Sequence, residues 1–471
     1  MSYEYDLVVI GLGPAGMAVS LMGSAMGLKV CAVEKHRVGG ECMNVGCIPS
    51  KSLLRIAAYR SSSDKLNKMG LADLAKPQIS EPFGRIQEYL KFINEKKTMG
   101  MFDKVQMVYQ KGPASFVDSH TVQAGGQKYS AKRIFICTGT SPSIPKIDGI
   151  ENIDYLTNEN IFSLGKVPQS MIVLGGGAIA CEMAQGFARL GTKVTIIIRG
   201  PRLMWREDTD ATNLIEKTFE AEGITILREQ KPVKFEKQNN MVVMQTDKGQ
   251  SVAAEKILVA AGRKYDYKEL SLDKAAIETA ENGSIKVDKY LRTNCKHIFA
   301  AGDCNGSYLF SHAAMHQGMI ALMNSMMPRL FKMNYKKYPV PWTVFTEPQF
   351  SRVGMNEKQL GDAGIKYEIV RVNYGDYGAA IAEGVEDGFI KAFVGKTGRI
   401  YGVYIIGEGS GEMINEWTTA IQNKISIFKI MMQQHSFPTM GFLTKRASET
   451  WMINKMKSKT LQKICRFMFR I

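Results

Sequence analysis

Short apolar runs separated by glycine turns dominate the first 35 residues. An apolar run at residues 7–10 enters the segment GLGPAG at residues 11–16, and a helix-compatible stretch continues to Met26. The next predicted strand covers residues 29–34, with an apolar run at 30–33. Runs of four to six apolar residues bounded by glycine are typical of buried strands in a parallel sheet. The order of strand, glycine turn, helix and strand predicts a βαβ unit.

The glycine turn of this unit has the spacing of a dinucleotide site. Gly11 permits the tight turn, Gly13 lets backbone N–H groups approach a pyrophosphate, and Gly16 lets the helix pack on the strand. Glu34 ends the second strand, where a carboxylate can accept two ribose hydroxyls. The alternative is a purely structural glycine turn. The acid at this distance favours a bound dinucleotide.

A second unit repeats the pattern with a different ending. Residues 171–174 form an apolar run that leads to Gly175 and Gly177, with Ala180 in place of the third glycine, and a helix is predicted through residue 190. The following strand, residues 194–198, ends in Arg199, with Arg202 nearby. Because a 2′-phosphate needs a cation, this ending favours NADPH over NADH. The alternative is that Arg199 is a solvated surface residue.

Two dinucleotide units in one chain indicate a flavin in one and a nicotinamide in the other, with hydride transfer between them. Residues 298–303 predict another short strand that ends in an acid and returns the chain to the first nucleotide. After residue 338 short strands at 366–372 and 388–394, followed by helices around 411–433, predict a separate α+β domain. The predicted class is therefore α/β, with two Rossmann-like dinucleotide-binding domains and a C-terminal α+β domain.

The amino-acid composition limits the class of protein and the cellular compartment that we expect. The chain has 471 residues, 45% of them hydrophobic and 23% charged, which excludes a mainly disordered chain, a collagen and a small disulfide scaffold. No apolar run reaches the ~18 residues of a transmembrane helix, and the N-terminus lacks the features of a signal peptide. We expect a cytoplasmic protein, where a cysteine pair is more often catalytic or metal-binding than structural.

Two cysteines directly follow the first unit. Cys42 and Cys47 lie in the segment GGECMNVGCIPSK at residues 39–51, with Gly46 between them and Lys51 after them. A cysteine near a helix start and beside a lysine has a lowered pKa, and two such thiols can alternate between dithiol and disulfide. A metal site is the rival interpretation, but no other Cys or His cluster in the sequence completes a ligand set. Inert buried cysteines are the remaining alternative.

These motifs resemble the pyridine nucleotide–disulfide oxidoreductases, and in particular lipoamide dehydrogenases and mercuric reductases. The resemblance covers about residues 4–450 and includes Thr138-Gly139-Thr140, Gly262-Arg263 and Ala301-Gly302-Asp303. It implies domains at residues 1–150 (FAD, first part), 151–265 (NAD(P)H), 266–338 (return to the FAD domain) and 339–450 (dimerisation), followed by a tail at 451–471. It also implies a homodimer.

The resemblance assigns roles to single residues. It implies that Cys47 is the thiol beside the flavin, that Cys42 is the outer thiol that meets the acceptor, and that Lys51 lies near the flavin and pairs with Glu182. The implied FAD contacts are Gly11, Gly13, Gly16, Glu34, Lys51, Thr138, Gly139 and, for the ribityl chain, Asp303. The implied nicotinamide-nucleotide contacts are Gly175, Gly177, Ala180, Arg199 and Gly262.

One segment departs from the family pattern. Lipoamide and glutathione reductases carry a His–Pro pair, supplied by the partner subunit as acid–base catalyst, and a later Glu that orients the His. Here Phe437 stands at the His position and Phe442 at the Glu position, and His435 is a weak candidate to substitute. Mercuric reductases carry a C-terminal cysteine pair, whereas this chain has only Cys465 there. A positioned base contributes typically about 10²–10⁴-fold in rate, so exchange with lipoamide should suffer.

The sequence therefore predicts an NADPH-preferring FAD enzyme that passes electrons through Cys42 and Cys47 to an acceptor that needs no His base. A metal ion, a quinone or a small disulfide would qualify. One alternative is a dihydrolipoamide dehydrogenase that tolerates Phe437. Another is a non-catalytic flavoprotein that acts as a sensor or scaffold, although the intact cysteine pair argues against it.

The basic charge is concentrated at the C-terminus. The formal net charge is +16, and +7 of it lies in residues 445–471. The cations Lys459, Lys463, Arg466 and Arg470 share one helical face, and Leu461, Ile464, Cys465 and Met468 share the other. Such a helix fits an anionic membrane surface, so peripheral contact at the inner face of a membrane is one expectation, and nucleic acid is not expected. The slightly favoured alternative is that its apolar face docks on the protein's own body.

Overall fold

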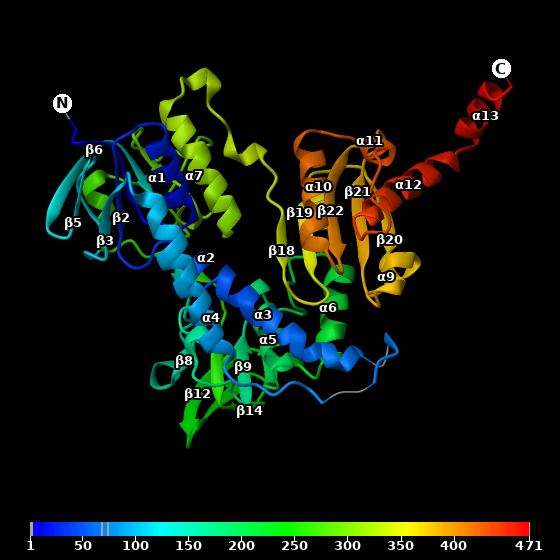
Figure 1. The fold of residues 1–471 in the computed structure, drawn as a ribbon, viewed down its shortest axis with the longest axis horizontal. Helices are drawn as coiled ribbons and strands as arrows, with labels where there is room; N and C mark the ends of the chain where they lie inside the picture. The colour runs from blue at the N-terminus through cyan, green and yellow to red at the C-terminus, as the bar shows by residue number, and fades with distance from the viewer. Residues whose placement is uncertain (1–2, 67–68, 73–74, 471) are drawn as a thin grey trace. The chain divides into compact units, whose positions relative to one another are not determined.

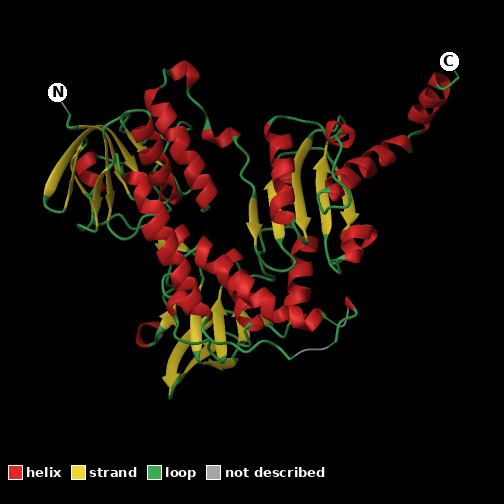
Figure 2. Cartoon of the chain, viewed as in Figure 1, coloured by secondary structure: helices red, strands yellow, loops and turns green. Residues whose placement is uncertain are grey.

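The computed structural model describes residues 3–66, 69–72 and 75–470. The chain divides into two compact units, coloured along the sequence in Figure 1. The first unit contains residues 1–56, 78–175 and 232–337, and the second contains residues 57–77, 176–231 and 338–471. Both units combine helices with sheets, as Figure 2 shows, which agrees with the α/β class predicted from the sequence.

The largest sheet belongs to the first unit and has the strand order β3-β2-β1-β6-β5-β4, with β17 paired to β6. The neighbours β3, β2, β1, β6 and β17 run parallel, whereas β4 and β5 form an antiparallel extension on β6. The strands are β1 (Tyr5–Ile10), β2 (Val30–Glu34), β3 (Gln106–Tyr109), β4 (Ser115–Asp118), β5 (Thr121–Ala124), β6 (Gln127–Ile136) and β17 (Ile298–Ala300).

Two helices pack closely beside this sheet. α1 (Pro14–Ala25) connects β1 to β2, and α7 (Ser311–Met326) packs against it. A side chain at Gly318 of α7 would clash with the carbonyl oxygen of Ala15 in α1, so the contact requires a glycine. Because α1 begins directly after the glycine turn, its N-terminus points its free N–H groups toward that turn. The first dinucleotide turn is thus held by a buried sheet and a glycine-lined helix contact.

The first unit also contains smaller sheets and helices. Three parallel strands follow the order β8-β15-β9, three antiparallel strands follow the order β12-β13-β14, and β7 pairs with β16. These elements are β7 (Ser141–Pro142), β8 (Tyr155–Leu156), β9 (Ser170–Leu174), β12 (Pro232–Gln238), β13 (Met241–Thr246), β14 (Ser251–Ala254), β15 (Lys256–Val259), β16 (Arg263–Lys264), α2 (Gly40–Asn44), α4 (Pro82–Lys91) and the start of α3 (Cys47–Ser61).

The second unit has two parts. One part contains α5 (Ala178–Arg189), α6 (Thr209–Ala221) and the parallel pair β10 (Lys193–Ile197) and β11 (Thr225–Leu227). The other is an antiparallel sheet of order β18-β19-β22-β21-β20 covered by helices. Its elements are β18 (Trp342–Val344), β19 (Phe350–Gly354), β20 (Glu368–Asn373), β21 (Phe389–Val394), β22 (Ile400–Ile406), α8 (Glu357–Asp362), α9 (Gly378–Ala382), α10 (Ser410–Gln422), α11 (Ile427–Met432), α12 (Phe442–Met456) and α13 (Lys459–Met468).

The core of the antiparallel sheet is built around two tryptophans. Trp417 of α10 is fully buried and donates from its ring nitrogen to Thr444 of α12 at 3.2 Å. Trp451 of α12 is buried as well, and its ring nitrogen donates to Glu368 of β20 at 2.6 Å. Each indole thus satisfies its only polar group inside the core. Among the described residues, no helix is both long and apolar enough to cross a membrane.

Candidate functional site

The first glycine turn joins β1 to α1. Gly11 has φ +89°, and a side chain there would clash with the carbonyl oxygen of Cys137. Gly16 has no room for a side chain either, because a Cβ would collide with the carbonyl oxygen of Gly11. At Gly13, by contrast, the space beside the Cα is open, and α1 begins at the next residue. The turn therefore leaves room for an anion where free N–H groups of the helix are available.

Glu34 closes the same turn from the end of β2. Its side chain is buried, and its two oxygens accept hydrogen bonds from the backbone N–H groups of Leu12 and His36, both at 2.7 Å. A carboxylate has about four acceptor positions, so two remain for hydroxyl groups. The residues of this turn fit the pyrophosphate and adenosine ribose of a dinucleotide such as FAD.

A second carboxylate of the first unit, Asp303, lies at the end of the return strand β17. Thr140 donates its hydroxyl to Asp303 at 3.2 Å, and the guanidinium of Arg263 lies 3.9 Å from the same carboxylate. Burial raises the pKa of Asp303, an effect that Arg263 and Thr140 partly offset. Arg263 also donates to Thr140 and pairs with Glu41, the residue before Cys42. Arg263 thus connects Asp303 with the cysteine segment.

The predicted contacts Thr138 and Gly139 lie between β6 and this network. Gly139 has φ +70°, and the space beside its Cα is open. Both residues offer backbone hydrogen bonds to the buried thiol of Cys304. Their backbone is therefore fixed at the carboxyl end of the parallel sheet, the edge at which doubly wound α/β folds bind their ligands.

The two cysteines of the segment at residues 39–51 lie close together. Cys42 lies in α2, Cys47 is the first residue of α3, and their thiols form a hydrogen bond. Both are free thiols, which corresponds to the reduced state of the pair. Cys47 also contacts the hydroxyl of Ser311 at 3.3 Å, at the start of α7. The positive end of a helix and a hydroxyl donor both stabilise a thiolate.

The pKa of Cys42 shows how the pair shares its protons. The hydrogen bond to Cys47 raises the pKa of Cys42 most, and burial raises it further, while Ser311 and Lys51 oppose these effects. Cys42 therefore keeps its proton and donates to Cys47. A protonated thiol that contacts a second sulfur fits a pair that alternates between dithiol and disulfide.

Four other cysteines have none of these features. Burial raises the pKa of Cys31 and of Cys304 to about 12, and it also raises the pKa of Cys137 and of Cys181. A buried thiol that keeps its proton is a poor nucleophile. The chemistry of this chain therefore concentrates on Cys42 and Cys47.

The second glycine turn copies the geometry of the first. Gly175 has φ +121°, and a side chain there would clash with the carbonyl oxygen of Ala260, while the space beside Gly177 is open. α5 begins directly after Gly177, and Ala180 is buried in its first turn. Gly262, another predicted contact, has φ +130° with open space beside it. Within the second unit, the open space at Gly177 directly before α5 leaves room for an anion.

The two arginines after β10 have different environments. Arg199 is exposed, whereas Arg202 donates to the backbone carbonyls of Trp205 and Glu207 at 3.1 and 2.8 Å. Arg206 lies over the ring of Trp205, with 5.5 Å between the guanidinium carbon and the ring centroid. Arg202 therefore holds the loop, and Arg199 is the cation that a phosphate can reach.

Glu182 and Lys51 belong to different units, so their pairing stays a prediction. Within the second unit Glu182 is buried in α5 and accepts a hydrogen bond from the backbone N–H of Phe345 at 3.0 Å. Lys51 lies in α3, one turn after Cys47.

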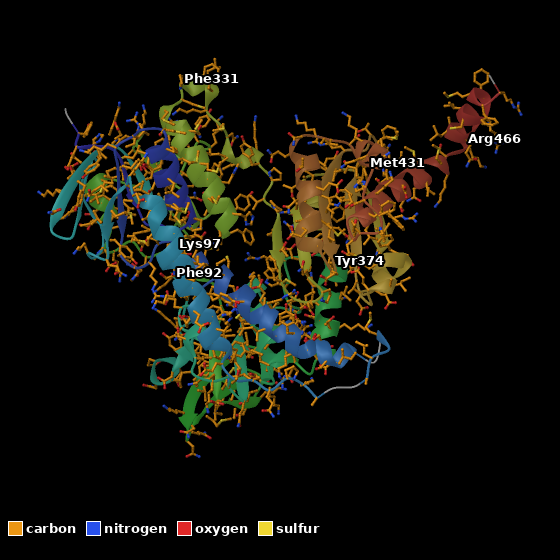
Figure 3. The ribbon with its side chains drawn as sticks, viewed as in Figure 1. Phe92, Lys97, Phe331, Tyr374, Met431 and Arg466 are labelled. Atoms are coloured by element: carbon orange, nitrogen blue, oxygen red, sulfur yellow. The ribbon has the colours of Figure 1, made fainter. Side chains whose placement is uncertain are left out.

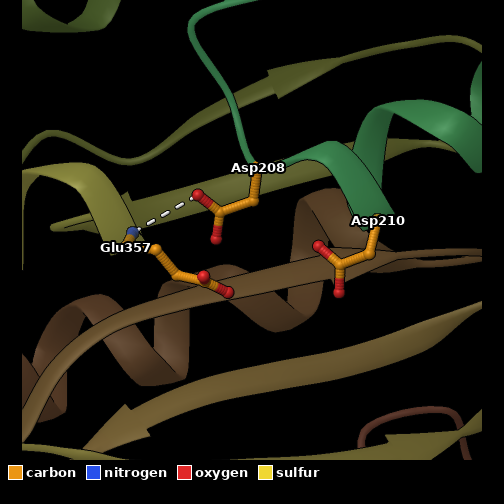
Figure 4. A group of neighbouring side chains, drawn as sticks. All are labelled: Asp208, Asp210 and Glu357. Atoms are coloured by element: carbon orange, nitrogen blue, oxygen red, sulfur yellow. Dashed lines mark hydrogen bonds between the residues drawn. The ribbon is translucent and has the colours of Figure 1, made fainter.

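Three carboxylates of the second unit form the group that Figure 4 shows. Asp208, Asp210 and Glu357 have oxygens close enough to hold a metal ion. The buried ammonium of Lys391 lies among them, 3.1 Å from Asp208 and 2.8 Å from Asp210, and it also pairs with Glu357. Since this buried cation already pairs with all three carboxylates and offsets part of their charge, we interpret the group as an ion-pair cluster that fastens α6 and α8 to β21.

The segment at residues 433–442 contains the two aromatic residues, Phe437 and Phe442, at which this chain differs from the family pattern. Phe437 is 69% exposed and packs edge-on against Phe442, with ring centroids 5.2 Å apart, and Tyr377 flanks both rings. His435 is partly buried, with a side chain that is 8% exposed, and its Nε2 lies 3.0 Å from Glu416. His435 is thus held by an acid and is not presented to solvent in the way Phe437 is.

Family models now decide the assignment. The model for pyridine nucleotide-disulphide oxidoreductases matches residues 5–318, and the model for the dimerisation domain of the same family matches residues 340–447. The chain belongs to this family. It is accordingly an FAD-dependent NAD(P)H oxidoreductase with a redox-active disulfide, and it acts on a sulfur group or a metal. The second match supports a homodimer.

Relatives and solved structures of this oxidoreductase agree with that assignment. The mercuric reductase of Staphylococcus aureus is 30% identical over 95% of this chain and 82% of its own length. The dihydrolipoyl dehydrogenase of Thermus scotoductus is 31% identical over 94% and 97%. The HOCl-induced flavoprotein disulfide reductase RclA from Escherichia coli superposes with a TM-score of 0.85 and 26% identity, covering 94% of this chain and 99% of that chain.

The structure adds residues that sequence reasoning missed. Ser311 is 264 positions from Cys47, and Arg263 is 222 positions from Glu41. No local sequence pattern connects positions so far apart. Arg263 belongs to the Gly262-Arg263 motif of the family resemblance, but that motif does not indicate its contact with Glu41. A hydroxyl at the start of a helix that follows a nucleotide-binding acid is the only sequence signal that Ser311 offers.

Proposed function

We propose that this oxidoreductase prefers NADPH and passes electrons through Cys42 and Cys47 to an acceptor that needs no histidine base. A metal ion, a quinone or a small disulfide meets this condition. When bound, FAD would supply two-electron transfer from the reduced nicotinamide to the Cys42–Cys47 disulfide, which is thereby reduced to the dithiol. The protein supplies the binding turns and the paired thiols, with the hydroxyl of Ser311 beside Cys47.

The proposed FAD contacts come from the first unit. Glu34 would hold the adenosine ribose with its two remaining acceptor positions, and Asp303 would hold the ribityl hydroxyls. Cys47 would face the flavin and Cys42 the acceptor, as the resemblance to the family implies, and the two thiols lie close enough together to form a disulfide when they are oxidised. The full set of proposed contacts is Gly11, Gly13, Gly16, Glu34, Lys51, Thr138, Gly139 and Asp303.

The NADPH preference rests on Arg199. The open space at Gly177 can receive the pyrophosphate, and the adjoining strand ends in an exposed arginine and not in a buried acid. Arg202 is unsuited to this role because two backbone carbonyls already occupy it. The proposed nucleotide contacts are Gly175, Gly177, Ala180, Arg199 and Gly262.

The acceptor class rests on Phe437. A lipoamide-type exchange needs an imidazole and a carboxylate that orients it, and the aromatic pair Phe437 and Phe442 offers neither. The nearby His435 is partly buried against Glu416. Acceptors that take electrons without a proton relay therefore fit this chain better than lipoamide does.

We propose the domain division 1–150, 151–265, 266–338, 339–450 and 451–471, in the order FAD part, NADPH domain, FAD return, dimerisation domain and tail. We also propose a cytoplasmic location with peripheral contact at the inner face of a membrane through residues 451–471.

The test is NADPH-driven turnover with lipoamide, glutathione disulfide, Hg²⁺, Cu²⁺ and quinones, for the wild type and Cys42→Ala. Acceptors that depend on the dithiol should lose nearly all turnover in Cys42→Ala, while acceptors that survive take electrons from the flavin. Cys295→Ala is the control, because Cys295 is a partly buried thiol of the same unit. Wild-type turnover of lipoamide as fast as that of quinones or metals would contradict the proposal, and a higher kcat/KM with NADH would contradict the NADPH preference.

A gain-of-function variant tests the role of the aromatic pair. Phe437→His combined with Phe442→Glu places an imidazole and a carboxylate at the two positions whose rings are now in contact. This double variant should raise lipoamide turnover by about 10²-fold or more. Phe442→Glu alone is the matched control and should gain nothing. No gain in the double variant would show that the missing base does not limit lipoamide exchange.

A further inference from the structure

The last helix lies beyond the part of the chain that the dimerisation-domain model matches. That match ends at residue 447, inside α12, whereas α13 begins at Lys459. α12 is tied to its sheet because Glu368 accepts from the Trp451 ring nitrogen and pairs with Lys455 at 2.7 Å. No comparable anchor is present for α13 among the described residues. α13 is therefore an appendage on a firmly packed helix.

The apolar side of α13 is open to solvent. None of its ten residues is buried, and Figure 1 shows the helix extending from the end of α12. Phe467 and Met468 are 68% and 67% exposed, and Phe469 directly after the helix is 95% exposed. Among the described residues of its own unit, no element covers this face, and its docking on the rest of the chain stays an expectation. The sequence periodicity identified the helix but contained no information on what covers it.

The opposite side of α13 is uniformly cationic. Lys459, Lys463, Arg466 and Arg470 follow a spacing of four, three and four residues, which places them on one face. Figure 3 marks Arg466 on this helix. Residues 450–471 contain six Lys and Arg and no Asp or Glu. None of these four cations, three on α13 and Arg470 just after it, forms an ion pair with a residue that the structure describes.

Building on the peripheral contact proposed above, we infer that α13 is an interfacial helix that binds bilayers containing anionic phospholipid. A ten-residue helix is only marginally stable in water, so a surface that covers its apolar side also stabilises its fold. A bilayer interface accepts Ile464, Phe467 and Met468 among the acyl chains while the anionic headgroups attract the Lys and Arg side chains.

A second copy of this chain is the weaker occupant on electrostatic grounds. Of the formal net charge of +16, +6 lies in residues 450–471, which leaves +10 on the rest of the chain. Pairing two tails would bring +6 against +6, and docking a tail on a partner's body would bring it against a basic protein. Like charges repel at both contacts, whereas an anionic bilayer attracts them.

The experiment is vesicle co-sedimentation of the flavin-containing protein. Vesicles of phosphatidylcholine alone are compared with vesicles that contain about one-third phosphatidylglycerol. The wild type should bind the anionic vesicles, and the variant that ends at Ser458 should not. Lys463→Gln with Arg466→Gln should lower the partition coefficient by about 30-fold, since each cation near the surface contributes about 1 kcal/mol.

Two further variants separate charge from apolar contact. Ile464→Gln with Phe467→Gln should also lower binding at least about 10-fold, because two buried apolar side chains are lost. Lys128→Gln with Lys248→Gln removes the same charge from exposed positions of the first unit and should change binding little. All variants should keep the wild-type flavin content and turnover with soluble acceptors, which shows that they are folded.

Equal sedimentation of the wild type and the truncated form would overturn the inference. A tail-dependent assembly larger than the truncated protein in analytical ultracentrifugation without vesicles would also overturn it, in favour of a second copy. Absence of NADPH turnover with every acceptor would sink the proposed function, yet vesicle binding by the wild type would still support the membrane role of α13.

Discussion

The two glycine turns have nearly the same backbone but end in opposite charges. Gly11 and Gly175 both have positive φ and both face a backbone carbonyl that excludes a side chain, and Gly13 and Gly177 both leave open space before a helix. The strand after the first turn ends in the buried Glu34, whereas the strand after the second ends in the exposed Arg199.

This difference in charge indicates that the glycine turn and the end of the following strand have separate roles in binding a dinucleotide. The turn provides N–H groups and room for a pyrophosphate, which every dinucleotide carries. The strand end meets the adenosine ribose, where an acid suits free hydroxyls and a cation suits a 2′-phosphate. We propose that the chain uses the same backbone turn twice and selects each ligand by the residue at the end of the following strand.

The largest expected effect comes from filling the open space of either turn. Gly13→Val should lower the affinity for FAD by at least about 100-fold, because losing two charge-assisted hydrogen bonds costs about 3 kcal/mol or more. The backbone of Gly13 is extended at ψ −175°, and no atom lies near its Cβ position, so the variant should fold. Flavin absorbance and circular dichroism measure the two properties.

The matched variant is Gly177→Val. It should keep its flavin and raise the KM for NADPH by a similar factor, since the same space is filled in the second turn. Full flavin content in Gly13→Val, or flavin loss in Gly177→Val, would break the assignment of the two turns.

A smaller effect is expected at the strand end. Arg199→Ala should lower kcat/KM for NADPH by about 10–100-fold and leave NADH nearly unchanged, because one charge-assisted contact to the 2′-phosphate is worth about 1.5–3 kcal/mol. Lys193→Ala removes an exposed cation from the other end of β10 and serves as the control. A parallel loss with both nucleotides would show that Arg199 does not read the 2′-phosphate.

The smallest effect concerns the second carboxylate of the first unit. Burial raises the pKa of Asp303 above its unfolded value. Its contribution to stability is therefore complete below the unfolded pKa, about 3.9, and is lost as the pH rises through the folded pKa. After flavin removal, Asp303→Asn should have a higher Tm than the wild type at pH 7, with the difference vanishing toward pH 4.

Thermal unfolding between pH 4 and 8 measures this difference. Asp273→Asn, at an exposed position without such burial, should show no pH-dependent gain. A gain for Asp303→Asn that grows as the pH falls would contradict the raised pKa of Asp303.

Much of the fold could be predicted because its signals are local. The apolar runs at 7–10, 171–174 and 388–394 became β1, β9 and β21 with shifts of one or two residues at their ends. The antiparallel strands β12, β13 and β14 were not predicted. Few of their positions are buried. Polar residues interrupt β12, and the apolar run of β13, residues 241–244, is short and lies next to no glycine turn or helix pattern that would identify it.

The candidate site could be predicted only where one segment contains the chemistry. Cys42, Cys47 and the glycine turns are short motifs whose spacing is constrained by geometry. Ser311 and Arg263 reach the cysteine segment through tertiary contacts over more than 200 residues, and the ion pairs of Lys391 depend on three separate elements. Such contacts follow from packing, which periodicity does not encode.

The close contact between α1 and α7 has a consequence for redesign of this enzyme. Gly16 and Gly318 cannot accept even a methyl group without colliding with backbone, so a random library at these positions would return almost only unfolded clones. Phe437, 69% exposed at the surface of its unit, should tolerate most of the twenty amino acids. The tolerance of this chain for amino-acid substitutions thus differs strongly between positions. Directed evolution toward a new acceptor should begin at residues 433–442.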